Sequence, residues 1–317
     1  MTRVFMFPGQ GAQHLGMGKD LFDRFPEKTA QADDVLGYSI RELCLDDPEG
    51  RLAHTEFTQP AVYVVNSLAY AAALTQEIAP DVAIGHSLGE YNALAAAGVF
   101  GFADGLRLVT ARARAMAAIT DGGMSAVSGM DEAVIRLLLR RAGLESVEVA
   151  NLNTADQTII AGPLAKLTAA ATLLRGSGAR SVRELNVSGP FHTRHMTPAA
   201  AAFAPVLRAT ALAAPAFPVI ANRTARPYTA DSLIELMRDQ IDHPVLWQRT
   251  VEQLDGPGAE FKEIGVGTVL TRLLRAIRSS AHGASGAARP TSPRITTAPR
   301  STAATAAAAV TAEKDRA

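Results

Sequence analysis

Residues 85–89, with the sequence Gly-His-Ser-Leu-Gly, fit the pattern G-x-S-x-G, in which a serine occupies a sharp turn between a strand and a helix. The apolar run at 82–84 predicts a buried strand before this turn, and the Ala-rich run at 90–97 predicts a helix after it. Glycines flank the serine because such a turn leaves no room for side chains beside it. The hydroxyl of Ser87 would then project from the end of a sheet at a helix N-terminus. We therefore predict an α/β fold with Ser87 as a nucleophile.

The sequence around this turn predicts a large domain made of two separated stretches of chain. Residues 2–7 are rich in β-forming residues and predict a buried strand, and helical patterns dominate residues 18–79. Further helices are expected at 103–120 and 197–210, a short strand at 218–221, and more helices from there to about residue 278. We expect residues 1–123 and 188–278 to form one α/β-hydrolase-like domain with a short parallel sheet.

Residues 124–187 predict a smaller unit of a different kind. Its strands and helices are expected in the order strand, helix, strand, strand, helix, strand, at 124–130, 131–142, 147–151, 158–161, 164–176 and 181–187. Asp131 is the expected cap of the first helix. The order βαββαβ is that of a ferredoxin-like unit. We therefore expect a ferredoxin-like subdomain inserted in the large domain.

The last part of the chain differs in composition from everything before it. Residues 279–317 consist mainly of Ala, Ser, Thr, Pro and Arg, with almost no large apolar side chains. Such a segment buries too little surface to offset the entropy lost on ordering. We expect this tail to be disordered.

Charge and cysteine content narrow the possible classes of function. Lys+Arg and Asp+Glu both count 31, so the formal net charge is zero, which argues against a nucleic-acid binder. The single cysteine, Cys44, permits neither an intrachain disulfide nor a Cys-based zinc site, and we expect no metal. No stretch reaches the roughly 20 uninterrupted apolar residues of a membrane helix, and no secretory signal is evident at the N-terminus. We expect a cytoplasmic monomer.

A serine hydroxyl needs a base to become an effective nucleophile, and the chain offers seven histidines. His86 is next to Ser87 on the turn, so its side chain would point in another direction. His192 lies in a Gly-Pro turn after a predicted strand, from which a loop could lean over the active site. His195 is close by and stays an alternative. The full set of candidates is His14, His54, His86, His192, His195, His243 and His282.

A glycine-rich loop at 8–13, with the sequence Pro-Gly-Gln-Gly-Ala-Gln, follows the first predicted strand. It has neither a G-x-G-x-x-G pattern nor a Walker lysine, so a phosphate cradle is only one of its possible roles. The backbone N–H groups of the loop could equally form an oxyanion hole, or the loop could be a simple turn. These residues alone leave the three roles open.

Two arginines lie two positions apart on the predicted helix at 103–120, so they point to different faces. Arg112 lies near the apolar stripe of this helix, and a buried guanidinium needs an anionic partner. Its planar fork would suit a substrate carboxylate. Arg114 would face elsewhere.

Taken together, these motifs resemble the malonyl-CoA:acyl-carrier-protein transacylases and the acyltransferases of polyketide synthases. The resemblance covers about residues 4–278. Several motifs in the right order are more specific than any one of them. In chain order they are Phe7-Pro8-Gly9-Gln10-Gly11-Ala12-Gln13, Gly85-His86-Ser87-Leu88-Gly89-Glu90-Tyr91, Leu108-Val109 with Arg112 and Met116, Asn151-Leu152-Asn153, Gly162, Pro190-Phe191-His192 and Pro244-Val245-Leu246-Trp247.

The resemblance implies a role for each matching catalytic position. Ser87 would carry the acyl group and His192 would be its base. The backbone N–H groups of Gln10 and Leu88 would form the oxyanion hole. Arg112 matches the arginine that pairs with the free carboxylate of malonyl. The family uses a Ser-His dyad whose histidine is oriented by backbone carbonyls, so no third carboxylate is required.

Three further matching positions are expected to bind substrate. Asn153 belongs to one of the family motifs. Phe191 resembles the malonyl-selective pattern, whereas a serine at this position tends to accompany methylmalonyl in polyketide acyltransferases. Leu246 departs from the family, because many transacylases have Gln or Arg before the Trp. The departure is harmless if the position acts through its main chain.

The resemblance implies a ping-pong transfer of a malonyl-type group from coenzyme A to the phosphopantetheine thiol of an acyl carrier protein, in polyketide or fatty-acid biosynthesis. No permanently bound cofactor is expected, and malonyl-CoA is the expected substrate. The main alternative is an acyl hydrolase of the same fold, against which Arg112 argues. A catalytically silent docking module for carrier proteins and a general esterase, with Asp156 as the third group, are the others.

Overall fold

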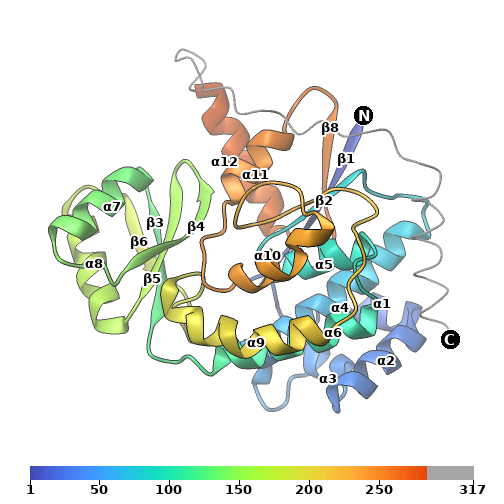
Figure 1. Cartoon of the computed structure of the whole chain (residues 1–317). Coiled ribbons are helices and arrows are strands. Elements are labelled where there is room, and N and C mark those ends of the chain that lie inside the picture. Colours follow the sequence, from blue (N-terminus) through green and yellow to red (C-terminus); the bar gives the residue numbers. More distant parts are fainter. Residues whose placement is uncertain (284–317) are drawn as a thin grey trace.

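The computed structural model describes residues 1–283 of the 317-residue chain, and a four-stranded parallel sheet forms its centre (Figure 1). Phe7 at the end of one strand pairs with Gly85 at the end of its neighbour, so both strands finish at the same edge of the sheet. The predicted α/β class with a short parallel sheet is confirmed. The strands, in the spatial order β7-β2-β1-β8, are β7 (Val219–Ile220), β2 (Val82–Gly85), β1 (Thr2–Phe7) and β8 (Ala259–Glu263).

The two faces of this sheet pack against different sets of helices, because side chains of a strand alternate between its faces. Phe5 and Phe7 of β1 belong to a core with side chains of α4, α5 and α6. Val4 and Met6 belong to a second core with side chains of α11 and α12, including Trp247. The helices of this part are α1 (Lys19–Arg24), α2 (Pro26–Leu36), α3 (Ile40–Leu45), α4 (Thr55–Leu74), α5 (Gly89–Ala96), α6 (Phe102–Ala117), α9 (Thr197–Ala209), α10 (Leu233–Asp239), α11 (Trp247–Leu254) and α12 (Val269–Gly283).

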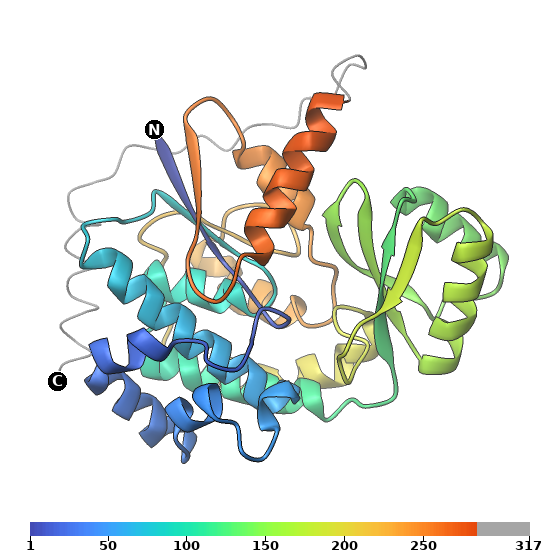
Figure 2. The same ribbon diagram turned by 180° about the vertical axis from the view of Figure 1, so that it is seen from behind.

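A second, antiparallel sheet lies to one side of the first, with its own two helices (Figures 1 and 2). Its spatial order, β4-β5-β3-β6, is that of a ferredoxin-like unit, as the sequence predicted. Asp131 caps its first helix by accepting a hydrogen bond from the N–H of Ala133. A separate apolar core fills the space between sheet and helices. The elements are β3 (Gly123–Ser128), α7 (Glu132–Arg141), β4 (Glu148–Thr154), β5 (Gln157–Gly162), α8 (Leu164–Gly176) and β6 (Ser181–Glu184).

Strand β8 corrects the expectation that only helices follow residue 221. Residues 259–263, Ala-Glu-Phe-Lys-Glu, pair in parallel with β1 along its whole length. The segment contains three charged residues and no β-branched residue, so its composition does not favour a strand. It forms an edge of the sheet, where charged side chains are tolerated because one side of the strand faces solvent.

The C-terminal helix also runs further than expected. Helix α12 continues past residue 278 to Gly283, so residues 279–283 are helical rather than part of a disordered tail. The rest of the predicted tail, residues 284–317, lies outside the described residues. The exact division of the chain into two domains at residues 123 and 188 stays a prediction.

Within residues 1–283 no helix is both long enough and apolar enough to cross a membrane. In the same part of the chain, no group of three or more His, Cys, Asp or Glu side chains is arranged to hold a metal ion.

Candidate active site

Ser87 lies in the turn between β2 and α5, with a left-handed backbone conformation (φ 52°) that side-chain-bearing residues rarely adopt. The turn closes tightly on its own backbone. A Cβ atom added to Gly85 would lie 2.0 Å from the carbonyl carbon of Gly89, and one added to Gly89 would lie 2.0 Å from the carbonyl oxygen of Phe7. Glycine is therefore required on both sides of Ser87, which agrees with the predicted strand, turn and helix.

His192 is the histidine that the fold brings to Ser87. Its Nε2 atom lies 2.7 Å from Ser87 Oγ. Its Nδ1 atom lies 2.8 Å from the backbone carbonyl oxygen of Gln240. A carbonyl oxygen only accepts hydrogen bonds, so Nδ1 carries the proton and Nε2 is free to accept one from the serine. His192, like Ser87, has a positive φ, of 61°.

The protonation state of His192 suits a base. Burial, together with the positive charge of Arg112, lowers the pKa of His192 to about 3. The imidazole is therefore neutral near pH 7 and can take a proton from Ser87. The alternative, His195, lies elsewhere, because its Nε2 contacts the carbonyl oxygen of Ser146 at 2.7 Å. His86 Nε2 lies 2.9 Å from Asn153 Oδ1.

Arg112 is fully buried beside the serine, whereas Arg114 is exposed and pairs with Glu56. One terminal nitrogen of Arg112 donates to Ser87 Oγ at 3.2 Å and to Gln240 Oε1 at 2.8 Å. The other donates to Gln59 Oε1 at 2.6 Å. Burial lowers the pKa of the Arg112 guanidinium. These side-chain partners are uncharged, and within residues 1–283 no carboxylate forms a salt bridge with Arg112, although the buried Glu90 acts on it from a longer distance. A carboxylate arriving in the site would therefore be the first to bind the guanidinium directly.

The loop after β1 lies directly on the serine turn. A Cβ atom added to Gly9 would be 2.3 Å from the carbonyl oxygen of His86 and 3.4 Å from the backbone nitrogen of Leu88. Within the described part of the chain, the backbone N–H groups of Gln10 and Leu88 donate to no protein acceptor. Leu88 immediately precedes helix α5, so its N–H group also lies at the positive end of a helix. This geometry favours an oxyanion hole over the alternatives of a phosphate cradle or a simple turn.

Two residues that the sequence did not single out hold the peptide groups of Ser87. Asn222 Oδ1 accepts a hydrogen bond from the Ser87 N–H at 2.7 Å. Gln240 Nε2 donates to the Ser87 carbonyl oxygen at 2.7 Å. Asn222 lies two residues after the end of β7, at the carboxyl edge of the parallel sheet, which is a general signal for a site residue. Gln240 follows helix α10 and carries no comparable signal.

A buried carboxyl group supports these two side chains. Glu90 Oε2 accepts from the Asn222 N–H at 2.9 Å and from Gln240 Nε2 at 3.3 Å. The hydroxyl of Tyr228 donates to its other oxygen. Burial raises the pKa of Glu90 to about 7. The sequence motif contained Glu90, but nothing in it indicated that its carboxyl group binds Asn222 and Gln240 and so supports the turn.

A cavity of about 220 Å³ opens in front of Ser87 and His192, between the large sheet and the small subdomain. Phe191 and Asn153 line it, as expected, together with Met116. Leu246 is not among the lining residues. Its backbone N–H donates to the carbonyl oxygen of Asn222 at 2.9 Å, so its main chain supports the site, and a role for its side chain in binding stays a prediction.

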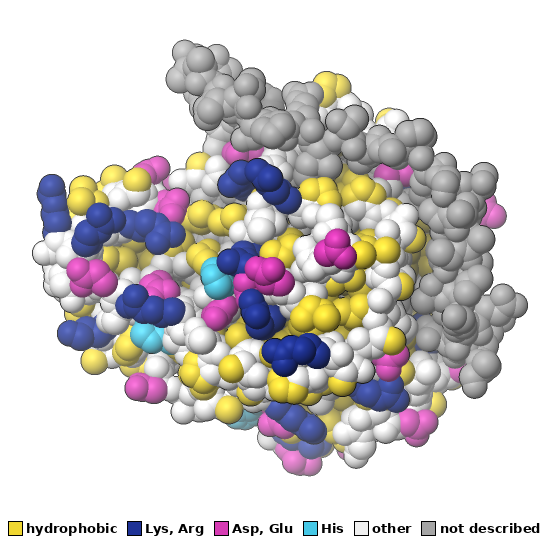
Figure 3. Space-filling model, viewed as in Figure 1, with side chains coloured by type: hydrophobic (Ala, Val, Ile, Leu, Met, Phe, Trp, Pro, Cys, Tyr) yellow, Lys and Arg dark blue, Asp and Glu magenta, His cyan; other side chains and the backbone are white. Residues whose placement is uncertain are grey.

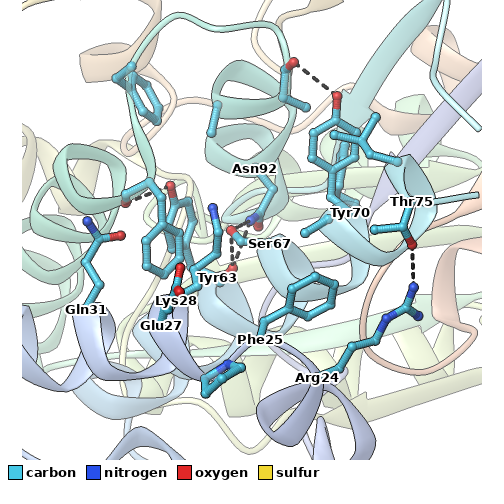
Figure 4. A pocket seen from close by; sticks show the side chains of 18 residues that line it. Arg24, Phe25, Glu27, Lys28, Gln31, Tyr63, Ser67, Tyr70, Thr75 and Asn92 are labelled. Atoms are coloured by element: carbon cyan, nitrogen blue, oxygen red, sulfur yellow. Dashed lines mark hydrogen bonds between the residues drawn. The ribbon is translucent and has the colours of Figure 1, made fainter. Parts of the chain in front are cut away.

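A larger cavity, of about 550 Å³, lies on another side of the large domain, among α2, α4 and α5 (Figure 4). Its walls are rich in aromatic side chains, and several of its polar side chains, among them Tyr63, Tyr70 and Asn92, donate to nearby carbonyl groups. Ser87, His192 and Arg112 do not line it.

The chain matches the model of the acyl transferase domain family over residues 4–312. It is 45% identical to the polyketide biosynthesis malonyl CoA-acyl carrier protein transacylase PksC of Bacillus subtilis, covering 88% of this chain and 98% of that protein. It is 47% identical to the polyketide biosynthesis protein ThaF of Burkholderia thailandensis, but it spans only 25% of the length of that relative.

Solved structures agree in fold. The crystal structure of a malonyl CoA-acyl carrier protein transacylase from Burkholderia pseudomallei has a TM-score of 0.85 and 46% identity, covering 88% of this chain and 98% of that one. A malonyl-transacylase solved in complex with its type II polyketide synthase acyl carrier protein has a TM-score of 0.84 and 34% identity, covering 88% of this chain and 94% of that one.

Proposed function

The chain belongs to the acyl transferase domain family and is an acyltransferase, and from this premise we propose that it moves a malonyl group from coenzyme A to an acyl carrier protein through an ester on Ser87. The observation that carries the proposal is the position of Ser87 Oγ, 2.7 Å from the Nε2 base of His192 and 3.2 Å from the buried guanidinium of Arg112. A nucleophile, a base and an unpaired cation therefore converge on one point.

In the first half-reaction, Ser87 Oγ attacks the thioester carbonyl of malonyl-CoA while His192 Nε2 takes the hydroxyl proton. The tetrahedral intermediate carries a negative oxygen, to which the N–H groups of Gln10 and Leu88 would donate. When the intermediate collapses, the carbon–sulfur bond breaks and the proton on His192 passes to the departing thiolate. The products are malonyl-Ser87 and free coenzyme A.

The second half-reaction reverses the roles of the groups. The phosphopantetheine thiol of the carrier protein gives its proton to His192 and attacks the ester carbonyl of malonyl-Ser87. The carbon–oxygen bond then breaks, and Ser87 regains its proton from the imidazolium. Because the same base serves both directions, the enzyme needs no other proton carrier and no resident cofactor.

Arg112 would select the acyl group. The free carboxylate of malonyl can form charge-assisted hydrogen bonds with the guanidinium, whose hydrogen-bond partners in the protein are neutral. An acetyl or long-chain acyl group would leave this buried cation without a counter-charge, which is costly. Phe191 in the cavity wall leaves less room for an α-branch, which supports malonyl over methylmalonyl. The same cation argues against the alternative of a hydrolase that clears neutral acyl chains.

Sequence identity supports a role in polyketide biosynthesis rather than fatty-acid biosynthesis. The relatives named for polyketide biosynthesis are 43–47% identical, whereas a malonyl CoA-acyl carrier protein transacylase of Escherichia coli is 36% identical. The cytoplasm is the compartment that we propose, since coenzyme A thioesters are supplied there and the only cysteine, Cys44, is buried and unpaired.

Intact-protein mass spectrometry tests the proposal directly. The protein is incubated briefly with malonyl-, methylmalonyl- or acetyl-CoA, and a holo carrier protein is then added, with the apo carrier as control. We expect a malonyl adduct on Ser87 that disappears as the holo carrier gains the same mass. Steady release of coenzyme A without an adduct or carrier loading would instead indicate a hydrolase.

A further inference from the structure

One arginine of the small subdomain faces the catalytic cavity without a counter-charge. Arg183 is the only Lys, Arg, Asp or Glu side chain among the residues of 1–283 that line this cavity, since Arg112 is buried behind Ser87 and does not line it. It lies on β6, an edge strand, and it is exposed. The remaining lining side chains are apolar, hydroxyl, amide or imidazole groups.

The register of the sheet explains why Arg183 faces the cavity. On β6, Arg183 lies opposite Ala126 of β3, and the N–H of Leu185 donates to the carbonyl oxygen of Met124. Side chains alternate along a strand, so Arg183 and Leu185 share one face of the sheet, and all four of these residues line the cavity. Arg183 lies about 7 Å from Leu185 along the strand. Arg183 is exposed whereas Leu185 is half-buried, so Arg183 is the nearer of the two to the outside.

Two other arginines near this sheet are already paired. Arg180 of the small subdomain forms a salt bridge with Asp156, and Arg194, which follows the subdomain in the chain, forms one with Glu148. Within the described residues, Arg183 has neither a salt bridge nor a side-chain hydrogen bond. Its charge is thus available to a ligand, and a planar guanidinium is well matched to a phosphate group. The small-subdomain side of the molecule carries several Lys and Arg side chains on the face seen in Figure 3.

Part of the cavity wall carries uncharged amide groups. Asn151, Asn153 and Gln157, on strands β4 and β5, place amide groups on this wall. A pantetheine arm has the matching chemistry, because it carries amides along its length, a thiol at one end and a phosphate at the other. With the thioester at Ser87, the phosphate end would lie toward the mouth of the cavity.

We propose that Arg183 binds the phosphate at the end of the phosphopantetheine arm, the group that coenzyme A and the holo carrier protein have in common. The proposal rests on the proposed acyl transfer, because it assumes that the thioester reacts at Ser87. A single subsite then serves both half-reactions, since each donor or acceptor thiol arrives on the same arm. Arg183 contributes binding and does not touch the reacting atoms.

Paired substrates and variants test this subsite. Malonyl-CoA carries the phosphate and malonyl-pantetheine lacks it, and both are compared in the wild type and in Arg183→Ala. We expect kcat/KM for malonyl-CoA to fall about tenfold through KM, and the value for malonyl-pantetheine to stay within about twofold. Arg183→Lys should recover part of the loss, since it restores the charge without the fork. Arg180→Ala, which removes a paired arginine on the same surface, is the matched control.

The second part of the experiment uses the holo carrier protein as the acceptor. In Arg183→Ala, loading of the holo carrier from malonyl-Ser87 should also slow about tenfold, which supports a shared phosphate subsite. A loss confined to malonyl-CoA would assign Arg183 to the nucleotide part instead and overturn the proposal. An equal loss with malonyl-pantetheine would also overturn it. Failure of the wild type to form any malonyl adduct would refute the acyl transfer itself, which is a different result.

Discussion

The two cavities of this protein differ in a way that volume does not reveal. The larger, of about 550 Å³, contains polar groups that satisfy one another: Asn92 Nδ2 donates to the carbonyl oxygen of Tyr63 at 3.0 Å and to Ser67 Oγ at 3.1 Å (Figure 4). The smaller, of about 220 Å³, is lined by Ser87 and by Gln10 and Leu88, whose backbone N–H groups have no protein acceptor within residues 1–283. A search by size alone would choose the larger cavity, whereas groups that await a partner identify the smaller one.

The two cavities also differ in the backbone conformation of the residues around them. Within residues 1–283, the side-chain-bearing residues with positive φ are Asp47, Glu77, Ser87, His192 and Ala225. Two of them, Ser87 and His192, form the proposed catalytic dyad, and none lines the larger cavity. Such conformations persist only where the surrounding structure holds them, and they concentrate at functional sites.

The largest expected difference between the cavities comes from removing one hydroxyl from each. Ser87→Ala should lower acyl transfer roughly 10⁵-fold and abolish the malonyl adduct, because the nucleophile is lost. Ser67→Ala, in the larger cavity, should stay within about twofold of the wild type. Transfer rates and intact-protein mass measure both. A malonyl adduct on the Ser87→Ala protein would show that another residue is acylated.

The next difference concerns charge and acyl selectivity. Arg112→Ala should reduce malonyl transfer roughly 100-fold while acetyl-CoA becomes a comparatively better substrate, because the counter-charge of the carboxylate is removed. Arg114→Ala, two residues away on the exposed face of the same helix, should change neither rate by more than about twofold. The ratio of kcat/KM values for malonyl- and acetyl-CoA is the measurement. An unchanged ratio in Arg112→Ala would exclude carboxylate recognition by this residue.

A third, smaller effect is the acid sensitivity of the catalytic cavity. The pKa of His192 is about 3 in the folded protein, against an ordinary value of 6.5, so between these values only the unfolded chain binds this proton. The free energy of unfolding should therefore fall as the pH is lowered through this window, by up to about 1.4 kcal/mol per pH unit.

His192→Asn should remove this contribution, so that the free energy of unfolding falls less steeply as the pH is lowered. The raised pKa of Glu90 acts with the opposite sign, since its contribution to stability is lost as the pH rises from 4.5 through about 7. Glu90 is present in both proteins, so the difference between wild type and His192→Asn isolates the histidine. Denaturant titrations at several pH values measure it, with the exposed His14→Asn as control. Identical slopes for wild type and His192→Asn would contradict the lowered pKa.

The smallest effect is expected from filling the larger cavity. Ala71→Leu adds apolar volume to its wall and should raise the free energy of unfolding by about 1 kcal/mol without altering acyl transfer. Ala93→Leu is the matched control: Ala93 is fully buried in packed core, so the same change should destabilise by about 1–3 kcal/mol. A clear loss of transfer in Ala71→Leu would mean that the larger cavity takes part in function after all.

The features that sequence predicted well are local in the chain. The strand, turn and helix around Ser87 and the βαββαβ order of the small subdomain depend on neighbouring residues, and the structure has both. Contacts between distant segments could not be derived in this way. His192 is 105 positions from Ser87, and spacing alone could not choose it from seven histidines; the family resemblance did. Asn222 and Gln240 were missed for the same reason.

Strand β8 was missed for a different reason. Its position at the edge of the sheet allows charged residues, and these hide the alternation by which strands are usually detected. Hydrogen bonds to β1 stabilise this strand, although its own residues do not favour one.

The contacts of Gln240 set a condition on redesign of this enzyme for other acyl groups. Its side chain holds both Ser87 and Arg112, and its carbonyl oxygen orients His192. Replacing Arg112 with a neutral residue to admit an uncharged extender would leave the acceptor oxygens of Gln59 and Gln240 without their donor. A change of acyl specificity therefore requires new hydrogen-bond donors to the side chains of Gln59 and Gln240. Without them, Gln240 would hold Ser87 less firmly.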